Sequence, residues 1–133
     1  MCGIAGWTNW GADLTTQQGI LDAMVETLTT RGPDASGSYV TLHAALGHRR
    51  LSVVDLEGGK QPMTRHKGTF AYTVTYNGEL YNTPELKADL ESRGYRFTTH
   101  SDTEVLLVAY IEYGPSCVER FNGIFAFGIW DEY

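Results

Sequence analysis

The sequence begins Met1-Cys2-Gly3-Ile4-Ala5-Gly6-Trp7, and this stretch decides how the rest is interpreted. Residues 3–7 are apolar, which predicts a short strand directly after the cysteine. Methionine aminopeptidase generally removes Met1 before a small residue, and removal would leave the α-amino group on Cys2 itself. That amine has a reference pKa of about 7.7–8.0, so a useful fraction is neutral near pH 7 and can accept the thiol proton. Cys2 is therefore a candidate nucleophile that carries its own base, and an ordinary buried strand cysteine is the alternative.

The composition is that of one globular domain. The chain has 133 residues, of which 42% are hydrophobic and 20% charged. Its net charge is −6, and its longest basic run is Arg49-Arg50, which argues against binding to nucleic acid or to an anionic membrane. The longest apolar run, residues 105–111, is too short to span a membrane. The first residues have no signal-peptide pattern, so we expect a cytoplasmic protein.

The first half of the chain predicts one helix followed by strands. Thr15 and Gln18 have the spacing of a capping box. Apolar residues then recur at helical spacing, namely Ile20, Leu21, Met24, Val25 and Leu28. The Gly and Pro of residues 31–34 should end this helix. Residues 38–55 predict two strands around a turn, residues 57–62 a loop, and residues 69–76 a further strand.

The second half predicts two helices and a last strand. Asn77-Gly78 is a pair that favours a sharp turn. Thr83 should cap a helix with Pro84 at its first position and apolar contacts from Leu86 and Leu90. Ser101 and Glu104 form a second capping box, before a helix through residue 113 whose apolar residues cover more than one face and predict burial between layers. Residues 124–130 predict a strand. This order favours an α+β fold with antiparallel sheets and helices packed on them.

Six short motifs occur along the chain in a fixed order. They are Met-Cys-Gly-Ile-Ala-Gly (residues 1–6), Arg-Gly-Pro-Asp (31–34), His-Arg-Arg-Leu-Ser-Val-Val-Asp (48–55), Gly-Lys-Gln-Pro (59–62), Tyr-Asn-Gly-Glu-Leu-Tyr-Asn (76–82) and Ser-Asp-Thr-Glu (101–104). Together they closely resemble the class II glutamine amidotransferase domain of glutamine-dependent asparagine synthetases, over essentially the whole chain. The resemblance implies an N-terminal-nucleophile hydrolase fold, a four-layer αββα sandwich with two mostly antiparallel sheets.

The resemblance also implies roles for the reacting groups. Cys2 would attack the side-chain amide carbon of glutamine. The oxyanion that forms needs hydrogen-bond donors, which the side-chain amide of Asn77 and the backbone N–H of Gly78 would supply. Apart from the resemblance, Asn-Gly more often marks a plain hairpin turn.

Other residues match positions that hold the amino-acid end of glutamine. Arg50 matches the arginine that grips the carboxylate, because it directly precedes Leu-Ser; Arg49 is the residue with which it could be confused. The same binding segment continues through Leu51, Ser52, Val53 and Val54. Asp102 matches the group that pairs with the substrate ammonium, with Glu79 near it. An acid at this helix position would also be favoured by the helix dipole alone.

The remaining polar and aromatic residues predict no further chemistry. The four histidines have no metal-ligand spacing, so no metal site is expected, and no catalytic role is assigned to His48. Cys117 is interpreted as a small buried hydrophobe. Strand-spaced aromatic residues are interpreted as core, namely Tyr72, Tyr76, Phe125 and Phe127.

The resemblance places this chain within a larger reaction. Glutamine would be hydrolysed to glutamate and ammonia, and a C-terminal synthetase domain would use ATP and Mg to amidate aspartate. No glycine-rich phosphate loop occurs here, so no cofactor is expected in this domain. Residues 1–133 are expected to be the N-terminal portion of the glutaminase domain, truncated at its C-terminus, and a homodimer is a common assembly of the family. An amidotransferase with another acceptor, a non-catalytic glutamine-binding module and an amidase for another amide stay open as alternatives.

Overall fold

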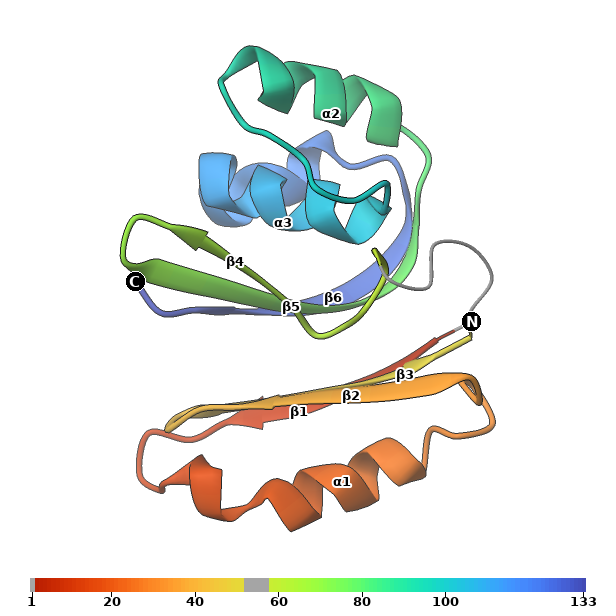
Figure 1. Cartoon of the computed structure of the whole chain (residues 1–133), viewed down its shortest axis with the longest axis vertical. Helices are drawn as coiled ribbons and strands as arrows, with labels where there is room; N and C mark the ends of the chain where they lie inside the picture. Colours follow the sequence, from red (N-terminus) through yellow and green to blue (C-terminus); the bar gives the residue numbers. More distant parts are fainter. Residues whose placement is uncertain (1, 52–57) are drawn as a thin grey trace.

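Two antiparallel sheets face each other in the computed structural model, which describes residues 2–51 and 58–133 (Figure 1). The first sheet has the order β1-β3-β2 and contains β1 (Gly3–Thr8), β2 (Ala35–Val40) and β3 (Ala44–Arg50). The second has the order β4-β5-β6 and contains β4 (Met63–Lys67), β5 (Phe70–Leu80) and β6 (Gly123–Asp131). The predicted α+β class with antiparallel sheets is confirmed.

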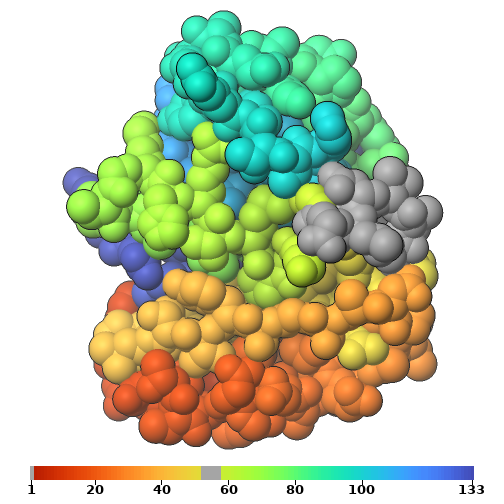
Figure 2. All heavy atoms as spheres, in the orientation of Figure 1, coloured from red at the N-terminus to blue at the C-terminus, as the bar shows by residue number. Residues whose placement is uncertain are grey.

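Helices cover the outer face of each sheet. In Figure 1, α1 (Gln18–Glu26) lies below the first sheet and α3 (Asp102–Tyr113) lies above the second, with α2 (Thr83–Ser92) packed on α3. The layers thus follow the order helix, sheet, sheet, helix. Figure 2 shows the red-to-orange half of the chain in contact with the green-to-blue half across this view. Within the described part of the chain, no helix is long and apolar enough to cross a membrane.

Helix α1 packs on β3 through a narrow apolar stripe. Leu21 and Val25 are buried, whereas Ile20 is 55% exposed, so only part of the predicted periodic set faces the sheet. A Cβ atom on Gly47 of β3 would lie 2.3 Å from Cγ2 of Val25. The missing side chain at this position lets the helix approach the strand closely.

The predicted start of this helix was wrong. A short 3₁₀ turn, η1 (Leu14–Thr16), comes first, and the carboxylate of Asp13 accepts a 2.9 Å hydrogen bond from the N–H of Thr15. Asp13 therefore caps the turn, and Gln17 precedes α1 without a side-chain cap. Thr15 lies inside this turn, where Asp13 is the capping residue, so it cannot cap the helix as predicted. The helix ends at Glu26, before Leu28.

Helix α2 contributes the predicted apolar pair, and its start differs by one residue. Leu86 and Leu90 are buried against α3 and β5. The N-cap is Asn82, and Thr83 is already helical. The Thr83 hydroxyl donates to the carbonyl of Leu80 and does not cap the helix.

Helix α3 is buried between layers, as predicted. Residues 103–109 are all buried. At its start the Ser101 Oγ atom accepts a 3.4 Å hydrogen bond from the N–H of Glu104, which is one arm of the predicted capping box. The other arm is not made, because the Glu104 carboxylate binds Thr98 and Thr99 instead. A second 3₁₀ segment, η2 (Gly114–Arg120), leads to β6.

The turn predicted at Asn77-Gly78 was wrong. Both residues lie inside β5 and pair with Ala126 and Phe125 of β6. The local turn preference is overridden by this long pairing. Strand β4, which the sequence analysis did not predict, forms the other neighbour of β5.

Candidate active site

A cavity of about 630 Å³ opens where Cys2, just before β1, lies near β3, β5 and the start of α3. Cys2 lines it, together with six other residues that the sequence had assigned to the site, namely Arg50, Leu51, Asn77, Gly78, Glu79 and Asp102. Residues from four separate motifs are thus brought to one cavity. Ser52, Val53 and Val54 lie outside the described residues, so their assignment to the binding segment stays a prediction.

Cys2 stands immediately before β1 and carries a free, half-buried thiol. The Nε atom of Arg31 donates a 3.1 Å hydrogen bond to the Cys2 carbonyl oxygen. This bond ties the arginine of the Arg-Gly-Pro-Asp motif to the nucleophile's backbone, a role the sequence analysis did not assign. The other cysteine, Cys117, is fully buried, and burial raises the pKa of its thiol to about 11. It remains a protonated core residue, as expected.

The two adjacent arginines at the end of β3 have different surroundings. Arg50 lines the cavity. Arg49 donates from its Nε atom to the carbonyl oxygen of Gly32 at 2.8 Å. Successive strand residues point to opposite faces of a sheet, so only one of the pair can face the cavity. Of the two, Arg50 is the arginine at the cavity, and its binding of a carboxylate stays a prediction.

Asn77 and Gly78 lie next to each other in the cavity lining, where Asn77 contributes a side-chain amide and Gly78 contributes backbone without a side chain. Gly78 has a φ angle of +154°, and a Cβ atom there would lie 2.3 Å from the carbonyl oxygen of Ile124. A glycine is required at this position by both conformation and space. The predicted oxyanion donors thus occupy a rigid strand position, held by the pairing with β6.

Asp102, the first residue of α3, is oriented by two donors. Its Oδ2 atom accepts a 2.8 Å hydrogen bond from the Tyr76 hydroxyl and a 3.3 Å hydrogen bond from the N–H of Leu80. Burial and the Asp102 carboxylate raise the pKa of Tyr76 well above its usual value of 10.0, so the phenol stays protonated and donates. Tyr76 had been interpreted as core only; it is buried, and its hydroxyl also helps build the site.

Gln61 is a second residue whose part in the site was missed. Its Oε1 atom accepts a 2.6 Å hydrogen bond from the N–H of Tyr76, and its Nε2 atom donates to the Thr103 hydroxyl at 3.3 Å. The side chain thereby links β5 to the first turn of α3. Gln61 belongs to the Gly-Lys-Gln-Pro motif, and this was the only sequence feature that pointed to it. The motif did not indicate which groups the Gln61 side chain would contact.

His48 lies on the cavity wall and is 1% exposed. Its Nε2 atom lies 3.1 Å from the carbonyl oxygen of Tyr76, so the imidazole donates from this nitrogen. Burial, assisted by the positive charge of Arg50, lowers the pKa of His48 to about 4. At neutral pH the ring is uncharged and joins the two sheets.

The described residues contain no group of three or more His, Cys, Asp or Glu side chains placed to hold a metal ion. Among the described residues, the cavity lining includes a thiol, backbone and amide donors, the Arg50 guanidinium and the carboxylates of Glu79 and Asp102. Such a set suits attack on an amide whose substrate also carries a carboxylate and an ammonium.

Comparison with known proteins identifies the family of this chain. The family model described as the glutamine amidotransferase domain matches residues 1–133. Asparagine synthetase [glutamine-hydrolyzing] 3 of Bacillus subtilis is 51% identical over 133 residues, which cover 99% of this chain and 22% of the relative. Asparagine synthetase B [glutamine-hydrolyzing] of Escherichia coli is 45% identical over 76% of this chain and 18% of its own length. The chain thus spans about a fifth of the curated relatives it matches.

Solved structures agree as well. One described as the allosteric regulatory enzyme of purine biosynthesis matches 99% of this chain and 36% of its own, with a TM-score of 0.71 and 24% identity, which shows likeness of fold. The glutamine phosphoribosylpyrophosphate amidotransferase from B. subtilis matches 70% of this chain and 22% of its own, with a TM-score of 0.58 and 31% identity. The chain therefore belongs to the glutamine amidotransferase domain family, in the class II form found in glutamine-hydrolysing asparagine synthetases.

Proposed function

We propose that this domain hydrolyses L-glutamine to glutamate and ammonia, with Cys2 as the nucleophile. The observation that carries the proposal is the single cavity that collects Cys2, Arg50, the Asn77-Gly78 pair and Asp102 from separate parts of the chain. Arg50 would bind the substrate carboxylate, and Asp102, with Glu79 beside it, would bind the ammonium. These contacts leave the side-chain amide of glutamine directed towards the thiol.

The proposed reaction runs in two steps. The thiol proton passes to the α-amine of Cys2, directly or through a water, while the sulfur attacks the amide carbon. The side chain of Asn77 and the N–H of Gly78 stabilise the oxyanion. The C–N bond then breaks, and the proton leaves with the nitrogen as ammonia. A water molecule hydrolyses the resulting thioester, which yields glutamate and restores the thiol.

The ammonia would serve the synthesis of asparagine in the full-length protein. The relatives' names favour aspartate as its acceptor. By the family resemblance, a C-terminal synthetase domain would use ATP and Mg for this amidation. An amidotransferase of the same branch with another acceptor is the alternative, because the cavity recognises glutamine and not the acceptor. A non-catalytic glutamine-binding module is the second alternative, and the half-buried free thiol in the cavity argues for catalysis over it.

The test is the change Cys2→Ala, with Cys117→Ala as its matched control. We expect Cys2→Ala to abolish ammonia release while glutamine still binds by calorimetry, because the other cavity residues are unchanged. Cys117→Ala should keep activity, since that thiol is buried in the core.

Mass spectrometry of the intact protein should show loss of Met1, and a glutamine analogue with an electrophilic carbon should label only Cys2. Ammonia release by Cys2→Ala, or labelling elsewhere, would refute the proposal; glutamine binding by the processed wild type without ammonia release would favour the non-catalytic module.

A further inference from the structure

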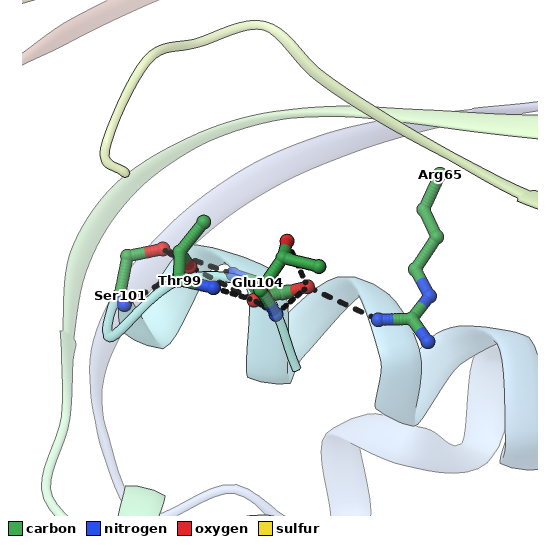
Figure 3. Close-up of polar contacts among 5 residues, drawn as sticks. Arg65, Thr99, Ser101 and Glu104 are labelled. Atoms are coloured by element: carbon green, nitrogen blue, oxygen red, sulfur yellow. Dashed lines mark hydrogen bonds and ion pairs between the residues drawn. The ribbon is translucent and has the colours of Figure 1, made fainter. Parts of the chain in front are cut away.

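One buried charge close to the cavity takes no part in the proposed chemistry. Glu104, in the first turn of α3, is 4% exposed. Its Oε2 atom lies 3.1 Å from Nη1 of Arg65 on β4, an ion pair drawn in Figure 3. Burying a carboxylate is costly unless it is paired and fully hydrogen-bonded. The burial of the Glu104 carboxylate therefore needs a structural or functional explanation.

The other partners of this carboxylate come from the loop that precedes α3. Its Oε1 atom accepts hydrogen bonds from the N–H groups of Thr98 at 3.1 Å and Thr99 at 2.8 Å, and from the Thr99 hydroxyl at 2.9 Å. Its Oε2 atom accepts from the N–H and the hydroxyl of Thr98, both at 3.2 Å. This loop is neither helix nor strand, so the carboxylate supplies acceptors that regular structure would otherwise provide.

The same contacts continue to Ser101. The N–H of Ser101 donates to the Thr99 hydroxyl at 3.2 Å, and the Ser101 hydroxyl accepts from the N–H of Glu104. Figure 3 shows Thr99, Ser101 and Glu104 joined in this way at the start of the helix. The Glu104 carboxylate therefore holds the backbone of the loop through several hydrogen bonds. Arg65, which pairs with the same carboxylate, connects the loop to β4.

The loop leads directly into the cavity wall. His100, Ser101, Asp102 and Thr103 line the cavity proposed to hold glutamine. Asp102 and Glu104 are two positions apart in a helix, so their side chains point in different directions. One faces the Tyr76 hydroxyl in the cavity, and the other holds the loop behind it. A shift of the loop would therefore move the Asp102 carboxylate relative to the other cavity groups.

From this arrangement we infer that Glu104 is a positioning residue for the end of the cavity that binds the α-amino group, with Arg65 as its counter-ion. It acts through the loop on Asp102 and touches no reacting atom. The identity of the substrate in this inference rests on the proposed function. The inference implies that Glu104 controls glutamine affinity more than the rate of the chemical step, because Cys2, Asn77 and Gly78 lie outside α3 and the loop before it.

The experiment replaces Glu104 by Gln, which keeps the size but removes the charge and replaces one of the two acceptor oxygens by an NH₂ donor, which faces N–H groups of the loop. We expect the KM for glutamine to rise at least about tenfold, while kcat changes less than about threefold. Glu112→Gln is the matched control, since Glu112 lies on the same helix and pairs with Arg93 away from the cavity. It should leave both constants unchanged. An unchanged KM in Glu104→Gln, or a fall confined to kcat, would overturn the inference.

Two further measurements keep the test decisive if Glu104→Gln folds poorly or the wild type is inactive. Arg65→Met should raise KM in the same direction, and Arg65→Lys, which keeps the charge, should restore part of the affinity. Amide hydrogen exchange should become at least about tenfold faster at residues 98–102 in Glu104→Gln and stay unchanged in β6. Wild type without ammonia release would count against the proposed function alone, and unchanged exchange at residues 98–102 would overturn the positioning role whatever the activity.

Discussion

At the residue scale, the contrast between Arg49 and Arg50 gives a direct test of glutamine recognition. Arg50 lines the cavity, and Arg49 bonds to the Gly32 carbonyl oxygen. We expect Arg50→Lys to raise the KM for glutamine at least about tenfold, because an ammonium cannot bind a carboxylate bidentately. Arg49→Lys should change KM less than about twofold. Steady-state ammonia release against glutamine concentration measures both, and equal effects of the two changes would contradict the assignment.

The residues that the sequence could and could not reveal differ in a physical way. Cys2, Arg50, Asn77 and Asp102 stand in ordered motifs, and the structure brings all four to one cavity. Their roles remain predictions, as does the assignment of Ser52, Val53 and Val54.

The sequence predicts no role for Gln61 and His48 and only a core position for Tyr76, because the part of these residues in the site depends on long-range contacts. A tyrosine at a strand position and a glutamine in a loop signal nothing until β5 and α3 lie side by side. His48 gave no metal spacing, and its bond to the Tyr76 carbonyl exists only where the two sheets meet.

At the element scale, β5 depends on the glycine in its interior. Gly78 combines a φ angle of +154° with a Cβ position that lies 2.3 Å from the Ile124 carbonyl oxygen. We expect Gly78→Ala to lower the free energy of unfolding by about 2–4 kcal/mol, because strain and collision with β6 add together. Urea unfolding followed by circular dichroism measures the loss.

The matched control for this change is Gly68→Ala. Gly68 also has a positive φ angle, +63°, but nothing lies within 4 Å of its Cβ position in the turn between β4 and β5. Gly68→Ala should lower the free energy of unfolding by only about 1–2 kcal/mol, because the left-handed backbone conformation is then the single source of strain. A smaller loss for Gly78→Ala than for Gly68→Ala would show that β6 yields to the added methyl group.

Most elements were predictable from periodicity, but the starts of α1 and α2 and the strand β4 were not. The apolar runs of β1, α3 and β6 and the buried pair of α2 appear where the patterns placed them. Strand β4 was missed because Met63–Lys67 is largely polar and exposed at the edge of its sheet. The Asn77-Gly78 turn signal failed because pairing with β6 outweighs a local preference.

At the scale of the whole molecule, the two sheets belong to separate apolar cores. One cluster packs β5 against α2 and α3, and a smaller one packs α1 against the first sheet, with Leu14, Leu21, Val25 and Ala45 buried. Between the sheets lie polar links. The Thr75 hydroxyl donates to the Gly47 carbonyl oxygen at 2.9 Å, and His48 donates to the Tyr76 carbonyl. Local sequence patterns predicted the helices and most strands of each sheet. They could not predict these two hydrogen bonds between the sheets, because each joins residues 28 positions apart.

The His48 link makes the stability of the molecule depend on pH. Its pKa is about 4 in the folded state, against 6.5 for an unperturbed histidine. Between these values the unfolded chain binds a proton at this site and the folded protein does not. The free energy of unfolding therefore falls as pH drops from about 6.5 towards 4, by up to roughly 3 kcal/mol from this residue.

This dependence can be separated from that of the carboxylates by comparing two variants. His48→Gln keeps an N–H donor for the Tyr76 carbonyl but cannot titrate, so we expect its free energy of unfolding to change less between pH 6.5 and 4 than that of the wild type. His66→Gln removes an exposed histidine from β4 and should keep the wild-type slope. Urea unfolding at half-unit steps of pH gives the slopes. If His48→Gln and wild type lose stability in parallel across this window, His48 is not held neutral between the sheets.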